Sequence, residues 1–98
     1  MPQFTVRVEL HGADASHYER LHGGMEALGF HRWIEGIDES GNRGKWQLPT
    51  GEYDGTVSMT AKEVRDSVRL IASAVKPGAW VLVTQVAARS WNTRKLQA

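Results

Sequence analysis

Close to the N-terminus, the sequence has the pattern of a strand that is followed at once by a helix, and this unit limits the possible folds. From Phe4 to Leu10, apolar and polar residues alternate, which is the pattern of a strand with one buried face. Asp14 or Ser16 can then cap a helix whose apolar residues recur at spacings of three and four, namely Tyr18, Leu21, Met25 and Leu28. Gly29 supplies the left-handed residue that ends many helices. Neither apolar face can be buried within this unit, so the rest of the chain must cover both.

A predicted hairpin follows this unit. Residues 30–37 are rich in aromatic and branched side chains and predict a second strand. The turn-forming residues 38–44 lead into a third strand at 45–48, which Pro49 should end or bend. Residues 53–59 are compatible with a continuation of that strand or with a short edge strand.

The last third of the chain predicts a second helix and a fourth strand. Thr60 and Glu63 form a capping box, in which each side chain bonds to the backbone N–H group of the other residue. Pro77 ends this helix. Residues 79–88 form a nearly continuous apolar run, which is typical of a strand covered on both faces. The apolar face of the helix contains Val64, Val68, Ile71, Ala72 and Val75.

The predicted order is therefore β-α-β-β-α-β. It is typical of α+β proteins with a ferredoxin-like fold, in which two helices cover one face of an antiparallel sheet. We expect a single domain at residues 1–88 and, at residues 89–98, a C-terminal tail or partner-binding arm. The sheet face without helices is either a solvated surface of mixed polarity or a surface covered by a ligand or a second copy. We expect a homodimer through a sheet face or edge, with residues 89–96 adding to the interface.

Composition supports one folded domain and limits the partners. The chain has 98 residues, of which 41% are hydrophobic, and this suffices for one core. It has no cysteine, no histidine spacing typical of a metal site and no nucleotide-binding loop, so we expect no metal and no cofactor. The net charge of +1 creates no strong overall field, so nucleic acid would bind only at a local patch. No apolar run approaches the roughly 20 residues that span a bilayer, and we expect a cytoplasmic protein without a membrane partner.

Several segments carry a resemblance to a known family: FTVRVELHGA, Tyr18 with the LH pair at Leu21 and His22, MEALGF, KWQLPTGEY and VLVTQVAARSW. They are similar to the small bacterial proteins typified by the GhoS antitoxin, which have a ferredoxin-like fold related to that of a CRISPR-associated family. The resemblance implies an RNA-binding endoribonuclease that cuts the messenger RNA of a toxin in a type V toxin–antitoxin system.

The resemblance leaves open whether this chain is an enzyme. The CRISPR-associated proteins present a carboxylate at the end of their first strand, and that carboxylate has no clear match here, because Leu10, His11, Gly12 and Ala13 come before Asp14. A relative that has kept the fold and lost cleavage is compatible with this difference. The alternative function is a non-enzymatic protein-interaction or regulatory module that uses the open face of the sheet.

Three residues at the end of the first strand and the start of the first helix are candidates for catalysis: His11, Asp14 and His17. Cleavage of RNA by its own 2′-hydroxyl group needs a base for that hydroxyl and an acid for the leaving oxygen, and two histidines can divide those roles. We expect His11 to transfer the proton, Asp14 to orient it, and the helix N-terminus to favour a phosphate. The simpler alternative is that Asp14 only caps the helix and both histidines are exposed. His22 is interpreted as a packing residue, and His31 receives no role.

Basic and aromatic residues alternate along the predicted strands and indicate a surface for single-stranded RNA. We expect Arg7 and Arg43 to lie near His11, because the first strand and the hairpin should open at the same end of the sheet. Trp46 matches, with Leu48, the inward side of the third strand, so we expect it to lie in the core instead of stacking on a base. The main candidates for nucleic-acid binding are Arg7, Arg32, Trp33, Arg43 and Lys45. The further candidates are Trp46, Tyr53, Arg89, Trp91, Arg94 and Lys95.

Overall fold

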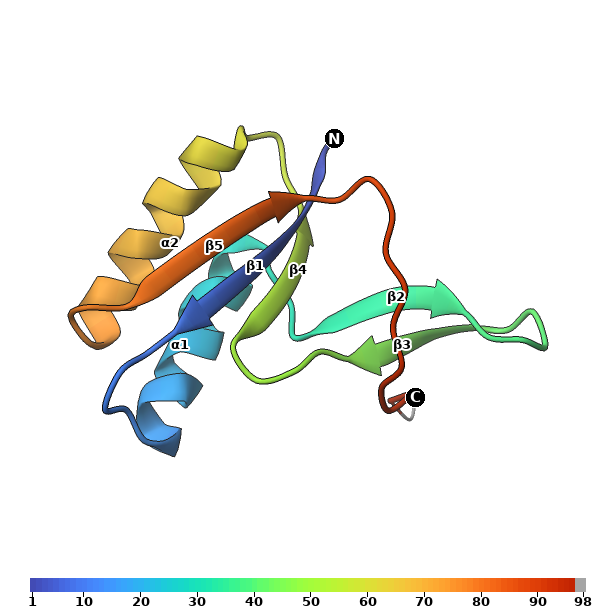
Figure 1. Cartoon of the computed structure of the whole chain (residues 1–98), viewed down its shortest axis with the longest axis horizontal. Coiled ribbons are helices and arrows are strands. Elements are labelled where there is room, and N and C mark those ends of the chain that lie inside the picture. Colours follow the sequence, from blue (N-terminus) through green and yellow to red (C-terminus); the bar gives the residue numbers. More distant parts are fainter. Residues whose placement is uncertain (97–98) are drawn as a thin grey trace.

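Strand β1 (Gln3–Glu9) lies at the centre of a three-stranded antiparallel sheet, between β4 (Glu52–Thr56) and β5 (Trp80–Gln85) (Figure 1). The computed structural model describes residues 1–96 of the chain. The alternation predicted for β1 is confirmed, because its inward residues are buried and its outward residues are largely accessible. The mixed α+β class is likewise confirmed.

Both predicted helices form, and their ends follow local sequence signals. Helix α1 (Ala15–Leu28) begins at Asp14, whose side chain accepts hydrogen bonds from backbone N–H groups of the first turn, and it is followed by Gly29 with φ of 99°. Helix α2 (Ala61–Val75) begins with the predicted capping box of Thr60 and Glu63. The helix ends just before Pro77, which has no backbone N–H group to continue it.

One hydrophobic core joins β1, β4 and the two helices. Val64 and Val68, from the predicted apolar face of α2, are fully buried in the same cluster as Val6 and Val8 of β1. Ile71 and Val75 lie at the margin of this cluster instead of at its centre. The remaining buried members are Phe4, Leu10, Leu21, Met25, Phe30, Tyr53 and Ala72.

Strands β2 (Trp33–Ile37) and β3 (Arg43–Gln47) pair only with each other and form a separate two-stranded sheet. Figure 1 shows this hairpin extending away from the helices. It is connected to the larger sheet by an isolated bridge between His31 and Asp54. The expected four-stranded sheet with two helices on one face is therefore wrong for this chain.

The break after β3 explains the difference. The backbone N–H group of Glu52 donates to the carbonyl of Pro49 at 3.0 Å, and Gly51 has φ of 85°, so the chain turns sharply after the hairpin. Residues beyond this turn enter β4 and pair with β1. The segment that was compatible with a continued third strand is therefore a distinct strand in another sheet.

The C-terminal segment returns across the hairpin. Strand β5 ends at Gln85, earlier than the predicted Ala88, and the expected cover on both of its faces is wrong, because Trp80 and Leu82 are exposed. Further along, the backbone N–H group of Gln47 donates to the carbonyl of Arg94 at 2.9 Å, and that of Leu96 donates to the carbonyl of Lys45 at 2.7 Å. The part of the predicted tail that the structure describes thus packs on the protein itself, and residues 97–98 lie outside the described residues.

Candidate nucleic-acid interface

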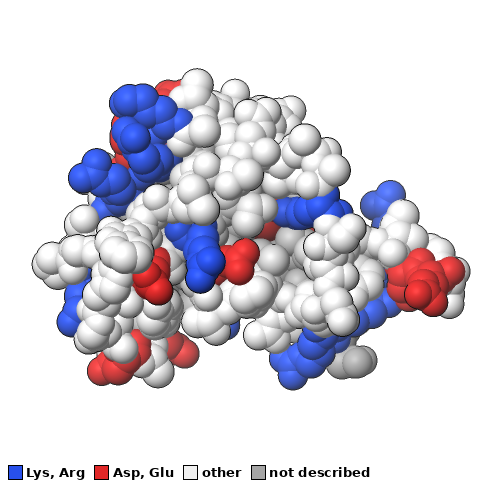
Figure 2. Space-filling model, in the orientation of Figure 1, with Lys and Arg blue, Asp and Glu red and all other residues white. Residues whose placement is uncertain are grey.

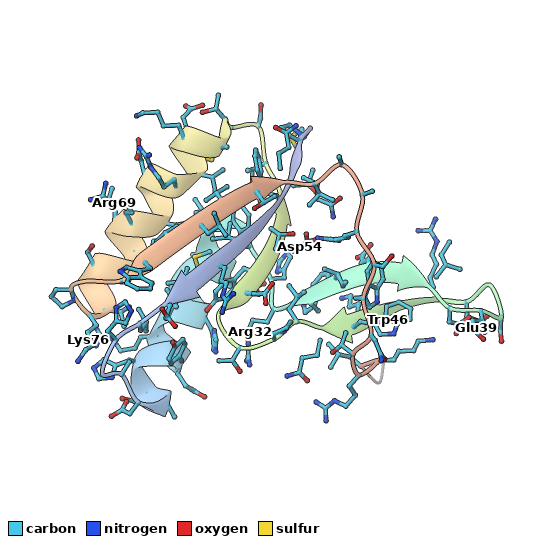
Figure 3. All side chains as sticks on the ribbon, in the orientation of Figure 1. Arg32, Glu39, Trp46, Asp54, Arg69 and Lys76 are labelled. Atoms are coloured by element: carbon cyan, nitrogen blue, oxygen red, sulfur yellow. The ribbon has the colours of Figure 1, made fainter. Side chains whose placement is uncertain are left out.

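One face of the β2–β3 hairpin combines basic, acidic and aromatic side chains. Because side chains alternate along a strand, Trp33, Glu35 and Ile37 share this face with their cross-strand partners Gln47, Lys45 and Arg43. A shallow groove of about 1150 Å³ runs beside them and also reaches Lys95 and Leu96. Figure 2 shows basic side chains along the hairpin and an acidic group at its turn, where Figure 3 places Glu39. We refer to the six paired residues as the hairpin face.

Trp33 lies at the base of the hairpin face, where β2 begins. The His31 ring stacks on its indole with 4.4 Å between ring centroids and 5° between ring planes. The Glu26 carboxylate holds that histidine, 2.9 Å from its Nδ1 atom. The Lys45 ammonium lies 4.0 Å from the indole centroid, and since a parallel ring fills one side of the indole, the ammonium covers the other. The indole is therefore fixed on one side and covered on the other by a flexible cation.

The opposite face of the hairpin is closed by the C-terminal segment. The rings of Trp46 and Trp91 pack with centroids 5.9 Å apart, and Figure 3 shows Trp46 beside that segment. The Lys95 ammonium lies 2.8 Å from an Asp38 carboxylate oxygen, and this hydrogen bond lowers the pKa of Asp38. Trp46 therefore packs against the tail instead of joining the main core.

Other candidates for stacking or phosphate contact have internal partners. Tyr53 is fully buried, so its ring cannot stack on a base, and that prediction is wrong. The Arg89 guanidinium lies 2.7 Å from the Asp54 carboxylate and also bonds to the hydroxyl of Thr5. Arg94 donates to the side-chain oxygen of Gln47 at 2.7 Å. These two arginines hold the C-terminal segment in place.

The three residues predicted for catalysis do not form one cluster. His11 has Nδ1 2.9 Å from the carbonyl oxygen of Gly78 and Nε2 3.2 Å from the carboxylate of Glu9, so its neighbouring carboxylate is Glu9 and not Asp14. Asp14 instead completes a capping box with His17, whose Nδ1 accepts from the backbone N–H group of Asp14 at 3.1 Å. The Ser16 hydroxyl and, next, the His17 backbone N–H group lower the pKa of Asp14 to about 2.

The expected meeting of His11, Arg7 and Arg43 at one end of the sheet is wrong. The C-terminal end of β1 and the turn of the β2–β3 hairpin lie at opposite ends of the molecule (Figure 1). Arg7 lies on the outer face of the larger sheet, in register with Glu52 on one side and Leu82 on the other. Arg43, Lys45 and Trp33 are thus grouped together, while Arg7 belongs to a different surface.

Sequence reasoning missed two contacts that involve histidines. One is the stack of His31 on Trp33, which the two-residue spacing along a strand could have indicated. The other is the contact between His22 Nδ1 and the hydroxyl oxygen of Tyr53, at 2.7 Å, which joins α1 to β4. The Arg32 guanidinium is close enough to affect the pKa values of both partners. No local sequence signal connects these residues.

A comparison with protein-family models finds no match for this chain, and a comparison with curated proteins finds none. Within residues 1–96, no three His, Asp or Glu side chains gather closely enough to share a metal ion. No helix in that part of the chain is long and apolar enough to cross a membrane. The case for a function therefore depends on the arrangement of the residues themselves.

Proposed function

We propose that this protein binds single-stranded RNA on the hairpin face and cleaves it, as an endoribonuclease of the GhoS antitoxin type acting on a toxin messenger RNA in the cytoplasm. The observation that carries the proposal is the indole of Trp33, fixed by His31 and covered by the Lys45 ammonium at 4.0 Å. Arg43 lies on the same face. The resemblance of the sequence to the antitoxin family supports RNA as the nucleic acid.

The arrangement suits an unpaired base. A base that stacks on Trp33 displaces the Lys45 ammonium, which then contacts the adjacent phosphate, so one movement supplies both a stacking and a charge interaction. Stacking of a base on an aromatic side chain contributes about 1–3 kcal/mol. A paired base inside a duplex cannot reach the indole, so single strands bind better than duplexes. The stack on His31 keeps the indole in place before RNA arrives.

The proposal includes a ferredoxin-like origin for the fold. The bridge between His31 and Asp54 places the start of the β2 segment beside β4, which in turn pairs with β1. The base of the hairpin thus stands where a ferredoxin-like sheet has its second strand. In this interpretation the hairpin extends beyond the sheet and presents its face for RNA.

A second candidate is a protein-interaction module that acts through the outer face of the larger sheet. Trp80 and Leu82 are 69% and 62% exposed there, and β5 is an edge strand that carries no charged residue. A second copy of the chain is the simplest partner, and light scattering of the parent and the Leu82→Ser variant tests it. A monomeric parent at tens of micromolar excludes the homodimer.

Fluorescence anisotropy with a labelled single-stranded RNA tests the leading proposal. Trp33→Ala removes the stacking surface and should weaken binding by about tenfold or more. Trp80→Ala is the matched control, because it removes an exposed tryptophan from the larger sheet. Equal affinities of the two variants would exclude the hairpin face, and equal affinity for single-stranded and duplex RNA would exclude base stacking.

A further inference from the structure

We infer that His22, positioned by Tyr53 and accompanied by Arg32, is the proton-transfer group for RNA cleavage. The inference depends on the proposed RNA function and adds a cleavage site at the junction of α1, β4 and the start of the hairpin. It replaces the predicted role of His11 at the end of β1.

The contact between His22 and Tyr53 is the basis of this site. His22 Nδ1 lies 2.7 Å from the hydroxyl oxygen of Tyr53, whose side chain is fully buried. The ring centroids of His22 and Tyr53 are 5.7 Å apart. Tyr18 precedes His22 by one turn of α1, and its ring centroid lies 6.3 Å from that of His22. Among the hydrogen bonds of residues 1–96, His22 Nε2 takes part in none. One nitrogen is therefore held by a rigid partner, and the other remains for a substrate.

The other three histidines are arranged differently. Both ring nitrogens of His11 face an acceptor oxygen, from Gly78 and Glu9. His17 uses its Nδ1 in the cap of α1, and His31 is stacked under Trp33 and paired with a carboxylate. His22 is thus the histidine whose orienting partner is a buried neutral hydroxyl.

Partial burial and the nearby Arg32 charge favour the neutral form of His22. Burial, followed by the positive charge of Arg32, lowers its pKa, against a smaller opposing effect of Glu19. Burial also raises the pKa of Tyr53, so the phenol stays protonated at neutral pH. When Nδ1–H donates to the Tyr53 oxygen, the lone pair of the imidazole is on Nε2, as a general base requires.

The chemistry then uses the RNA as its own nucleophile. His22 Nε2 takes the proton from a ribose 2′-hydroxyl, the 2′ oxygen forms a bond to the adjacent phosphorus, and the bond from phosphorus to the 5′ oxygen breaks. A water molecule protonates the leaving 5′ oxygen, and the hydroxide that remains takes the proton back from His22. The products are a 2′,3′-cyclic phosphate and a 5′-hydroxyl end, and Arg32 offsets the negative charge of the phosphate.

The position of Arg32 connects this site to the hairpin face. Arg32 immediately precedes Trp33 in the chain, and its guanidinium is close enough to His22 and Tyr53 to affect the pKa values of both. Successive side chains of an extended segment point to opposite sides, so an RNA strand bound on Trp33 has to cross the start of β2 to reach the guanidinium. Arg32 of the cleavage site and Trp33 of the hairpin face are in this way consecutive in the chain.

His22→Asn separates the catalytic role from a packing role. The asparagine amide can occupy the place of Nδ1 and keep the bond to Tyr53, while Nε2 is lost. Cleavage of a single-stranded RNA should fall by about 10²- to 10⁴-fold, with unchanged RNA affinity and melting temperature. The double variant of His11→Ala and His17→Ala is the matched control and should cleave like the parent.

Tyr53→Phe tests positioning. The hydroxyl accepts from the imidazolium that forms during the reaction, so its loss should lower the pKa of His22 and move the acidic limb of the pH–rate profile to lower pH. A substrate with a 2′-deoxy group at the cut should resist cleavage. Each of these readouts is independent of folding stability.

The outcomes separate this inference from the proposed function. RNA binding without cleavage by the parent overturns the inference and leaves the binding function intact, whereas absence of binding overturns both. Parent-like cleavage by His22→Asn, or loss of cleavage in the His11 and His17 double variant alone, also overturns it. An unchanged pH–rate profile in Tyr53→Phe contradicts the positioning role.

Discussion

At the scale of single residues, His22 and Asp14 make folding depend on pH in two separate ranges. The pKa of His22 is lowered from its ordinary value of 6.5, chiefly by burial. The unfolded chain therefore binds the His22 proton more tightly than the folded chain does. The contribution of His22 to the free energy of unfolding is complete above about pH 6.5 and decreases as the pH falls below that value. The pKa of Asp14 is lowered from 3.8 to about 2, so its contribution is lost between those values.

Two variants test this assignment. His22→Asn should flatten the dependence of the urea midpoint on pH just below pH 6.5, because asparagine does not titrate. Asp14→Asn keeps a capping side chain and should flatten the dependence only between about pH 4 and 2. A His22→Asn variant with the same pH profile as the parent contradicts the partly buried, neutral state of His22.

Gly51 is a residue whose backbone cannot accept a side chain. Its φ is 85°, and a Cβ atom there would lie 2.6 Å from the carbonyl oxygen of Val8. Gly41 has the same φ with no atom within 4 Å of its Cβ position, so Gly41→Ala is a control that adds strain without the clash. Gly51→Ala should cost roughly 1–3 kcal/mol more than the control in chemical denaturation, and equal costs would contradict the close approach.

At the scale of secondary structure, the sequence predicted the elements with local signals and missed their pairing. The start and end of α1, at Asp14 and Gly29, and the start of α2, at Thr60 and Glu63, could be predicted, because each signal acts within one helical turn. Pro49 marks the turn that separates β3 from β4. The sequence around this turn does not show that the strand after it pairs with β1. The contact of His22 with Tyr53 could not be predicted, because it requires β4 to pair with β1.

Helix α2 should depend strongly on Val68. This residue is fully buried in the core, so Val68→Asp places an unpaired charge there and should cost on the order of 3–5 kcal/mol, a large part of the stability of a small domain. Arg69→Asp, on the exposed side of α2, is the matched control, and Figure 3 shows Arg69 projecting outward. Similar urea midpoints for the two variants contradict the packing of α2.

The C-terminal segment should stabilise the hairpin. A chain ending at Ala88 loses the bonds from Gln47 to Arg94 and from Leu96 to Lys45, and it uncovers Trp46. Hydrogen exchange should then become faster in β3 while the amides of α2 keep their rates. Unchanged exchange in β3 would mean that the segment does not hold the hairpin in solution.

At the scale of the whole molecule, the hairpin makes the protein elongated, with extents of 44 × 29 × 20 Å. The helices and the larger sheet lie toward one end and the hairpin toward the other (Figure 1). The grouping of Trp33, Lys45 and Arg43 on one face could be predicted from two-residue periodicity. The separation of these residues from His11 could not be predicted, because it depends on β2 and β3 forming a sheet of their own.

The decisive measurement for RNA binding on the hairpin face is the salt dependence of the RNA affinity. The account predicts that the parent binds single-stranded RNA more weakly as salt rises, and that Lys45→Ala reduces the slope of log affinity against log salt by about 0.7, the value for one phosphate contact on a single strand. Lys62→Ala is the matched control, because Lys62 lies on the exposed side of α2 in an ion pair with Asp66. Its slope should equal that of the parent. An unmeasurable affinity of the parent, or equal slopes for the Lys45 and Lys62 variants, would contradict RNA binding on the hairpin face.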